Sequence, residues 1–317
     1  MTDHTALPPL PSTGACALPH LGVIRATGPD AASFLHNQLT QDFLLIQPHQ
    51  ARLAAFCNAK GRMQASMVGF KTGPEEVLLV MRQDLLAQTL KRLSMFVLRA
   101  KVKMSDASAE WGVWGVLAAS GDAAWTCKPV HDASAPDGVP ASLAVSLYPA
   151  VGVSRRLLVG PVASALPALA LEDWLLGEVL SGIADVQAAT FEAFVPQMLN
   201  YESVDGVNFK KGCYPGQEVV ARSQFRGTLK RRTYLVSSDS ALEAGQEVFK
   251  QSSAEVADTS QEPVGLVAQA ASHATHGHWA LVCLQNSALE EDGAVLRTVQ
   301  GAHLTLHPLP YALRDDI

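Results

Sequence analysis

The stretch NFKKGCYPGQEVVARSQFRGTLKRR, residues 208–232, carries the densest set of chemically active side chains in the chain. Cys213 follows Lys211 after one glycine and precedes the pair Pro215-Gly216. Glycine and proline favour a tight turn, so we expect the thiol in a loop rather than in a core. A thiol reacts as its thiolate, and a nearby ammonium group lowers the thiol pKa, whereas apolar burial raises it. Cys213 is therefore either a reactive thiol, with Lys211 as its electrostatic partner, or an inert loop cysteine.

The second half of this stretch is a basic run, made of Arg222, Arg226, Lys230, Arg231 and Arg232. Such a run is typical of a solvated face, and it also suits a polyglutamate tail, an acidic partner surface or RNA phosphates. The whole chain has a formal net charge of −6, so an RNA contact would be local. A single aromatic residue, Phe225, lies within the run, which is few for single-strand binding.

The order of residues resembles the signature of a known family. The octapeptide KGCYPGQE at 211–218, continued by Ala221-Arg222 and Arg226-Gly227, is similar to the central motif of the YgfZ family, folate-binding relatives of the glycine-cleavage T-protein. Shorter matches to the same family lie at TGPD (27–30), KGR (60–62), FVPQ (194–197) with Asn200, and LPY (309–311). The resemblance covers the chain from about residue 18 onward.

The resemblance implies an α+β fold, with two interwoven ferredoxin-like units as in the T-protein and then a small C-terminal β-barrel. We expect residues 1–17 to be a disordered tail, 18–228 to form the folate-binding region and 229–317 to form the barrel domain. The order strand, hairpin, strand, helix, strand over residues 21–104 agrees with a ferredoxin-like unit. Short β-type runs at 234–237, 263–268, 279–284, 295–299 and 303–306 agree with a barrel or sandwich.

The resemblance also implies a function. Members of the family bind a reduced folate such as tetrahydrofolate and support assembly or repair of iron–sulfur clusters, including those of tRNA-modifying enzymes, without a well-defined reaction. Cys213 would be the reactive residue, and the folate contacts would be Trp174, Gln197, Asn200, Lys211, Gln217, Glu218 and Arg222. The expected partners are folate and iron–sulfur enzymes or cluster-assembly proteins. A tRNA contact is left open, and we expect a monomer.

Each folate contact has a structural alternative. Trp174 offers a planar face for a pterin, yet a tryptophan in the apolar stripe of a helix is commonly a core residue. The amides of Gln197 and Asn200 suit the polar edge of a pterin, and they would equally satisfy loop backbone. Lys211 suits a folate carboxylate as a point charge. A second tryptophan of the family falls on Leu21 here, which removes one expected contact.

Two other functions are left open: a folate-dependent aminomethyl or methyl transferase, and a tRNA-binding module that uses the basic run. Residues 52–56 and 63–70 flank a turn with Gly61 and predict a β-hairpin. The resemblance places the folate-orienting aspartate of true T-proteins in this region, but MQASM at 63–67 has no carboxylate. A transferase needs a base near the folate amine, so this segment disfavours the transferase.

Composition and cysteine spacing set further limits. The 317 residues are 48% hydrophobic, enough for large cores, and the length predicts two or three domains. The five cysteines are scattered without a C-x-x-C pair, which excludes a compact zinc or cluster motif and indicates a reducing compartment. His273, His276 and His278 have a metal-like spacing without a neighbouring ligand, so we expect solvated histidines and no stably bound metal.

The first residues, MTDHTALPPLPSTGA, have no apolar core and no arginine, unlike a signal or transit peptide. No stretch of 18 uncharged apolar residues follows, so no membrane span is expected. We expect a cytoplasmic protein.

Overall fold

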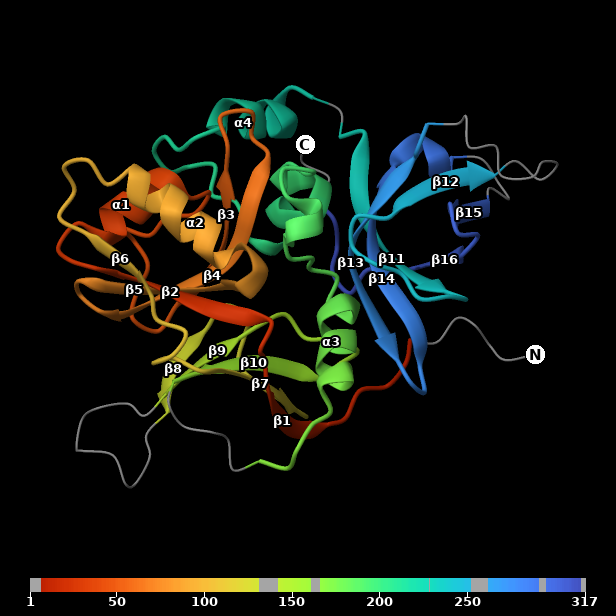
Figure 1. Ribbon diagram of the computed structural model, residues 1–317, viewed down its shortest axis with the longest axis horizontal. Coiled ribbons are helices and arrows are strands. Elements are labelled where there is room, and N and C mark those ends of the chain that lie inside the picture. The colour runs from red at the N-terminus through yellow and green to blue at the C-terminus, as the bar shows by residue number, and fades with distance from the viewer. Residues whose placement is uncertain are drawn as a thin grey trace.

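The computed structural model describes residues 7–130, 142–160, 166–227, 229–251, 262–290 and 295–314. Within them the chain forms two five-stranded antiparallel sheets and a closed six-stranded barrel. Figure 1 shows the sheets one above the other, with α3 (Leu171–Leu180) standing between them and the barrel. The expected α+β fold with a C-terminal barrel is therefore confirmed.

The first sheet contains, in spatial order, β3 (Ala51–Cys57), β4 (Met63–Gly73), β5 (Glu76–Arg82), β2 (Leu21–Thr27) and β6 (Lys103–Asp106). Its helices α1 (Ala31–Gln38) and α2 (Gln83–Met95) lie on the side away from the second sheet (Figure 1). The expected hairpin is formed by β3 and β4. Because helices cover one face and the second sheet the other, the central strands are apolar along most of their length.

The second sheet shows how the two units interweave. Its order is β1 (Thr13–Ala17), β7 (Val113–Ala118), β10 (Ser154–Val159), β9 (Ser142–Ser146) and β8 (Cys127–Val130). Strand β1 precedes the whole first sheet in sequence yet pairs with β7 of the second. The expectation of a disordered tail is therefore wrong for residues 13–17, because the partner strand that orders them lies a hundred residues away in the chain; residues 1–6 lie outside the described residues.

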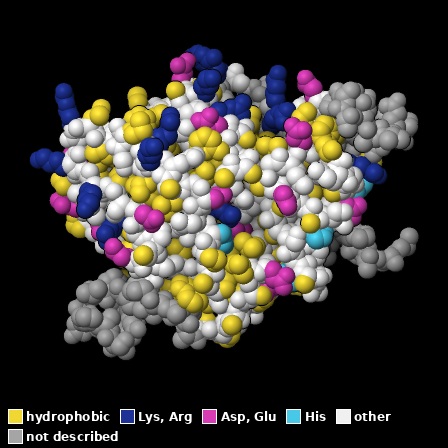
Figure 2. All heavy atoms as spheres, in the orientation of Figure 1, with side chains coloured by type: hydrophobic (Ala, Val, Ile, Leu, Met, Phe, Trp, Pro, Cys, Tyr) yellow, Lys and Arg dark blue, Asp and Glu magenta, His cyan; other side chains and the backbone are white. Residues whose placement is uncertain are grey.

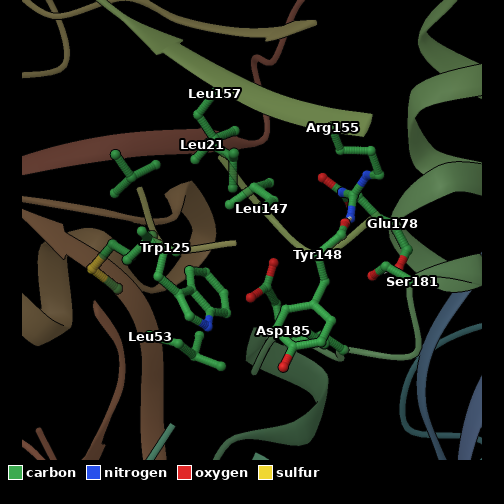
Figure 3. Close-up of a pocket in the computed structure, with 14 residues that line it drawn as sticks. Leu21, Leu53, Trp125, Leu147, Tyr148, Arg155, Leu157, Glu178, Ser181 and Asp185 are labelled. Atoms are coloured by element: carbon green, nitrogen blue, oxygen red, sulfur yellow. Dashed lines mark hydrogen bonds between the residues drawn. The ribbon is translucent and has the colours of Figure 1, made fainter. Parts of the chain in front are cut away.

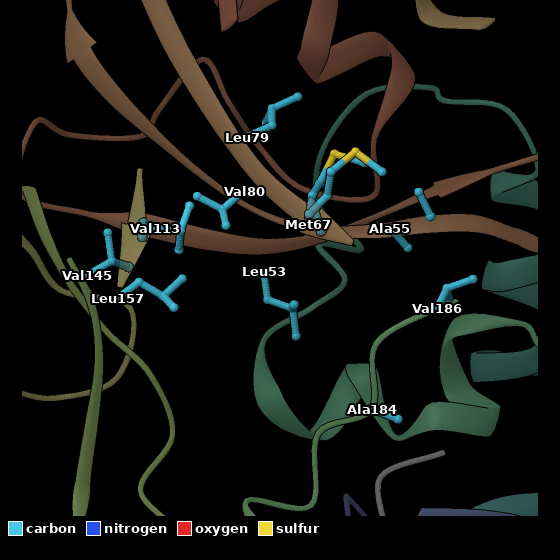
Figure 4. Close-up of a cluster of buried hydrophobic side chains, with 14 of the residues drawn as sticks. Leu53, Ala55, Met67, Leu79, Val80, Val113, Val145, Leu157, Ala184 and Val186 are labelled. Atoms are coloured by element: carbon cyan, nitrogen blue, oxygen red, sulfur yellow. The ribbon is translucent and has the colours of Figure 1, made fainter. Parts of the chain in front are cut away.

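The core lies where the two sheets face each other. Figure 4 shows Leu53 and Val80 of the first sheet opposite Val145 and Leu157 of the second. Helix α3 closes one end of this layer, and its Trp174 packs directly on β7. The close approach requires Gly115, since a Cβ there would lie 2.5 Å from the indole ring.

The barrel order is β11 (Arg231–Ser238), β14 (Gly277–Gln285), β13 (Gly265–His273), β12 (Glu247–Gln251), β15 (Val295–Thr298) and β16 (His303–His307). Five of these strands match the expected runs, and β12 is an addition that the sequence pattern missed. We propose the domain boundary at 228/229, close to the start of β11. In the described part of the chain no helix is both long and apolar enough to span a membrane.

The motif stretch forms a turn followed by α4 (Gln217–Phe225), which packs on the tip of the β3–β4 hairpin (Figure 1). Gly216 has φ +80°, and a Cβ on it would lie 2.4 Å from the carbonyl oxygen of Asn58. Only glycine therefore fits both the conformation and the close packing of turn against hairpin. Figure 2 shows Lys and Arg side chains gathered at the edge of the molecule over α4, where Arg222 and Arg226 are exposed.

Arg232 is a buried link rather than a member of the exposed basic run. In β11 it alternates with Arg231 and points inward, and its side chain is 10% exposed. Its guanidinium donates to Glu202 Oε1 at 2.7 Å and to Asn200 Oδ1 at 3.1 Å. Because Glu202 is fully buried, this pair ties the barrel to the irregular segment after α3.

We predict that Arg232→Leu destabilises the protein by about 3–5 kcal/mol, because it leaves the buried Glu202 carboxylate without its counter-charge. The measurement is the free energy of unfolding in urea. Arg231→Leu is the matched control, and we expect a change below about 1 kcal/mol. Equal effects of the two substitutions would contradict the role of the pair.

Candidate functional site

A cavity of about 60 Å³ lies between the two sheets and α3. Figure 3 shows its apolar wall on one side and a group of polar side chains on the other. The lining residues are Leu21, Leu53, Val68, Val80, Met81, Trp125, Leu147, Tyr148, Arg155, Leu157, Glu178, Ser181, Ile183 and Asp185. We call it the central cavity. A single water needs at least about 10–15 Å³ of such space, so the central cavity has room for more than one water.

Trp125 forms the aromatic wall of the central cavity. Its φ of +66° is rare for a bulky residue and is held by neighbours from both sheets. The Trp125 carbonyl accepts from the N–H of Ala51 on β3, and the Trp125 N–H donates to Ser146 on β9, each at 2.8 Å. The ring lies 5.7 Å from Tyr148. Because backbone bonds to two sheets fix this residue, the indole is presented to the cavity in a preset orientation.

Glu178 of α3 organises the polar end. Its Oε1 accepts from His20 Nε2 at 3.0 Å and from Trp174 Nε1 at 2.7 Å, and its Oε2 accepts from Gln269 Nε2 at 3.1 Å. Burial alone would raise the pKa of the Glu178 carboxyl, but the His20 hydrogen bond and the charges of His20 and Arg155 bring that pKa below its usual value. Glu178 is therefore the ionised carboxylate of the site.

Asp185 is the second carboxylate. It accepts from Ser66 Oγ of β4 at 3.2 Å, and its backbone N–H donates to Gln269 Oε1 of the barrel at 2.9 Å. Burial, and then the negative charge of Glu178, raise the Asp185 pKa above its usual value. The hairpin lacks a carboxylate, as its sequence indicates, but the chain after α3 supplies one beside that hairpin.

Arg155 of β10 lies across the cavity from Asp185 (Figure 3). Its guanidinium stacks over the Trp174 ring at 4.7 Å. Burial lowers the Arg155 pKa to about 10, partly offset by Glu178 and Asp185. Its Nε is buried without a hydrogen-bond partner among the described residues. A donor left in this state, beside two carboxylates and an apolar wall, fits a flat ligand whose edge carries both donors and acceptors.

Three of the predicted folate contacts are buried outside the cavity lining. Trp174 contacts the lining residues Glu178 and Arg155 but does not itself line the cavity. Gln197 donates from Nε2 to the Val220 carbonyl at 2.7 Å, and Asn200 donates from Nδ2 to the Thr233 carbonyl at 2.8 Å. Both amides satisfy backbone groups, which is the structural alternative that the sequence left open.

The motif residues lie in a different place from the central cavity. Cys213 is exposed, whereas Lys211 is only 8% exposed. The Lys211 ammonium donates to the carbonyls of His36 and Leu39 at the end of α1 and lies 4.6 Å from the Tyr214 ring. Its donors thus hold the loop against α1. The expected role of Lys211 as a folate contact stays a prediction, and none of the motif residues 211–218 lines the central cavity.

The remaining motif residues are on α4. Glu218 and Arg222 pair at 3.3 Å with both side chains largely exposed, which is an ordinary solvated pair, and Gln217 begins the helix. Arg222 also lines a shallow groove with Lys230 and Arg231. The folate contacts predicted at Gln217, Glu218 and Arg222 therefore also lie outside the central cavity.

Local sequence motifs did not mark the most polar and aromatic residues that line the cavity, which are Trp125, Tyr148, Arg155, Glu178 and Asp185. One signal was present for Glu178, because it is a lone acid within the apolar run LLGEVL of a helix. No local pattern marks Trp125, which lies in a turn between two strands of the second unit.

His273 lies close to a carboxylate from outside its own loop. Its Nε2 lies 3.1 Å from Asp173 Oδ1 of α3, and its ring stacks on His276 at 4.5 Å. Within the described ranges no group of three or more His, Cys, Asp or Glu side chains could hold a metal ion.

We predict that one thiol reacts with a maleimide in the native protein, and that Cys213→Ser abolishes this reaction. Cys213 is exposed, while the other four cysteines are buried. Burial raises the pKa of Cys57 to about 12 and that of Cys127 to about 11, so these thiols should react only after unfolding. Mass spectrometry of the labelled protein gives the number and position of adducts. A native adduct in Cys213→Ser would contradict the assignment.

We predict that Lys211 makes a contribution to stability that increases as pH rises from 8 to 9.5. Burial lowers the Lys211 pKa to about 8 in the folded state, against 10.5 for an ordinary lysine. Over this range the unfolded chain keeps the lysine proton and the folded chain loses it, so this contribution rises with pH, by at most about 2 kcal/mol. The four buried cysteines act in the opposite direction, because burial raises their pKa values. The measurement is therefore the difference in unfolding free energy between wild type and Lys211→Met, from urea unfolding at each pH. This difference should change in favour of wild type as pH rises, whereas the difference between wild type and Lys210→Met should stay constant.

No family model matches the chain. Individual proteins do. The "tRNA-modifying protein YgfZ" of Photorhabdus laumondii is 30% identical, and the alignment covers 93% of this chain and 91% of that protein. The protein of the same name from Yersinia pseudotuberculosis is 27% identical, over 99% of this chain and 98% of that protein.

Among solved structures, the glycine cleavage system aminomethyltransferase T of Bartonella henselae has the same fold, with a TM-score of 0.61. It is 15% identical, and the match covers 95% of this chain and 86% of that one. The structural match shows that the fold is shared. The sequence relatives match over nearly their full lengths, and they show the family. The chain belongs to the YgfZ family.

Proposed function

We propose that the protein binds a reduced folate, with the pterin ring in the central cavity. The observation that carries this proposal is the cavity itself: an enclosed space with an aromatic wall, two carboxylates and an orphaned arginine donor. It lies within a fold shared with an aminomethyltransferase. The family resemblance independently implies a folate, which supports the same proposal.

In this proposal Trp125 and Tyr148 provide the flat surface for the ring, in place of Trp174 and of the tryptophan replaced by Leu21. Leu21 lines the same cavity, so the loss of one indole is matched by another from the opposite unit. A pterin edge carries an amino group and ring N–H donors beside a carbonyl acceptor. Asp185 would accept from the donors, and the Arg155 guanidinium would face the acceptor.

The second part of the proposal concerns Cys213. We propose that its exposed thiol serves assembly or repair of iron–sulfur clusters of tRNA-modifying enzymes, as the relatives' name and the family resemblance suggest. Because Cys213 lies outside the cavity lining, ligand binding and thiol chemistry use separate surfaces. The scattered free cysteines support action in the reducing cytoplasm.

We predict that tetrahydrofolate binds the wild-type protein and that Trp125→Leu weakens the affinity by about tenfold or more, because a stacked aromatic contact is lost. Anaerobic titration calorimetry measures both affinities. Trp114→Leu, on β7 and outside the cavity lining, is the matched control and should bind like wild type. Cys213→Ala should also bind normally.

Thermal melting of each variant checks that the fold is intact. Two results would refute the proposal: a wild-type protein that binds no tetrahydrofolate, or a folded Trp125→Leu variant with unchanged affinity.

A further inference from the structure

A second, larger hollow lies next to the central cavity. It is an open groove of about 730 Å³. Its lining combines aromatic, cationic and amide side chains: Gln41, His49, Gln50, Arg52, Ala124, Trp125, Thr126, Asp205, Val207, Asn208, Phe209, Lys210, Gln224, Phe225 and Arg314. We call it the outer groove. Trp125 lines both spaces, so the outer groove and the central cavity are neighbours.

The sizes of the ligand and of the two spaces suggest how one ligand would be divided between them. The proposed function places the pterin ring in the central cavity, whereas a folate also carries an aminobenzoyl ring and a glutamate tail. The rest of the ligand must therefore leave the cavity, and Trp125 marks the side on which open space lies. We propose that the outer groove binds the aminobenzoyl-glutamate tail and that its cations select tails with several glutamates; this inference rests on the proposed function.

The groove has a surface for an aromatic ring. Phe209 and Phe225 meet edge to face, with ring centres 5.4 Å apart. Phe225 is 65% exposed, which is unusual for a phenylalanine on a short helix. Both rings line the groove, as does Trp125, so the groove offers aromatic surface. An aminobenzoyl ring bound there would cover part of the exposed Phe225 side chain.

The charge of the groove suits carboxylates. Arg52 donates only to uncharged acceptors, the Ala51 carbonyl and the Gln50 amide oxygen. The Lys210 ammonium is exposed and has no carboxylate partner among the described residues. Arg52 and Lys210 thus place two permanent cations on the groove, against the single carboxylate of Asp205 among the described lining residues. The groove is therefore positive in a chain whose net charge is −6.

A buried donor adds a specific contact. The Gln224 side chain is 1% exposed and lines the groove from α4. Its Nε2 has no hydrogen-bond partner in the described structure. A buried amide donor left unpaired costs free energy, which a ligand carboxylate or amide carbonyl would recover.

The other basic groove fits this tail less well. It is about 380 Å³ and is lined by Arg222, Lys230 and Arg231. It contains no aromatic side chain and shares no residue with the central cavity. Of the two grooves, we therefore assign the tail to the outer groove; a polyglutamate tail on the basic run stays one of the open alternatives.

The test compares tetrahydropteroyl monoglutamate with the triglutamate by anaerobic calorimetry. Wild type should bind the triglutamate about five- to tenfold tighter at low salt, since two or three exposed charge pairs contribute, and the difference should shrink as salt rises. The double variant Arg52→Gln/Lys210→Gln should lose this preference and keep most of its monoglutamate affinity. Lys230→Gln/Arg231→Gln is the control of equal charge change and should keep the preference.

The outcomes separate this inference from the function on which it rests. If wild type binds neither compound, the folate proposal fails. If wild type binds both compounds equally, the folate proposal stands and the outer groove assignment is wrong. A preference that disappears in the control variant instead would place the tail on the other groove. Loss of single-stranded RNA binding in Arg52→Gln/Lys210→Gln, with folate affinities unchanged, would assign the groove to RNA and overturn the inference.

Discussion

The buried carboxylate of Glu178 is the interaction on which the site depends. Its two oxygens accept from His20 before β2, from Trp174 one helical turn away, and from Gln269 in the barrel. Both α+β units and the barrel therefore meet at one charge. Losing the carboxylate would leave three buried donors without an acceptor, so Glu178 holds the walls of the cavity at fixed distances as well as giving it charge. Gln269 extends this control, because its other amide atom accepts from the Asp185 backbone.

The pKa values of the two carboxylates in the cavity are shifted in opposite directions. Glu178 is kept ionised by its hydrogen bonds and nearby cations, and its charge helps to raise the pKa of Asp185. Environments that move the pKa values of two carboxyl groups apart in this way commonly give one group an acid role and the other a base role. The hairpin MQASM has no carboxylate for the proposed folate site, but Asp185 beside Ser66 supplies one there. The absence of a carboxylate in the hairpin therefore no longer counts strongly against one-carbon transfer. The proposed accessory role rests on the family resemblance and the exposed thiol.

Local pattern was enough for much of the fold. Alternating and apolar runs predicted the β3–β4 hairpin and most barrel strands, and an apolar stripe predicted α3. Strand β1 was missed because its order comes from β7, far away in the chain. The cavity was missed for the same reason: Trp125, Arg155, Glu178 and Asp185 become a set only when the two sheets and α3 close around them. Motif reading also favours residues close together in sequence, whereas these ligand-facing groups come from separate segments.

The contacts of the motif residues give most of them a structural role. The Lys211 ammonium donates to carbonyl groups at the end of α1, and the buried Tyr214 ring packs against that ammonium. Gly216 allows the turn to lie against the hairpin. These three residues are explained by packing alone. Cys213 is not, because its side chain is exposed and nothing in the described fold requires a thiol there. In the proposed function a partner protein would need an accessible thiol on a fixed turn, and the structural residues of the motif would present Cys213 in this way. The adjoining residues 208–210 line the outer groove, so the proposed tail site and the thiol lie on neighbouring parts of one loop.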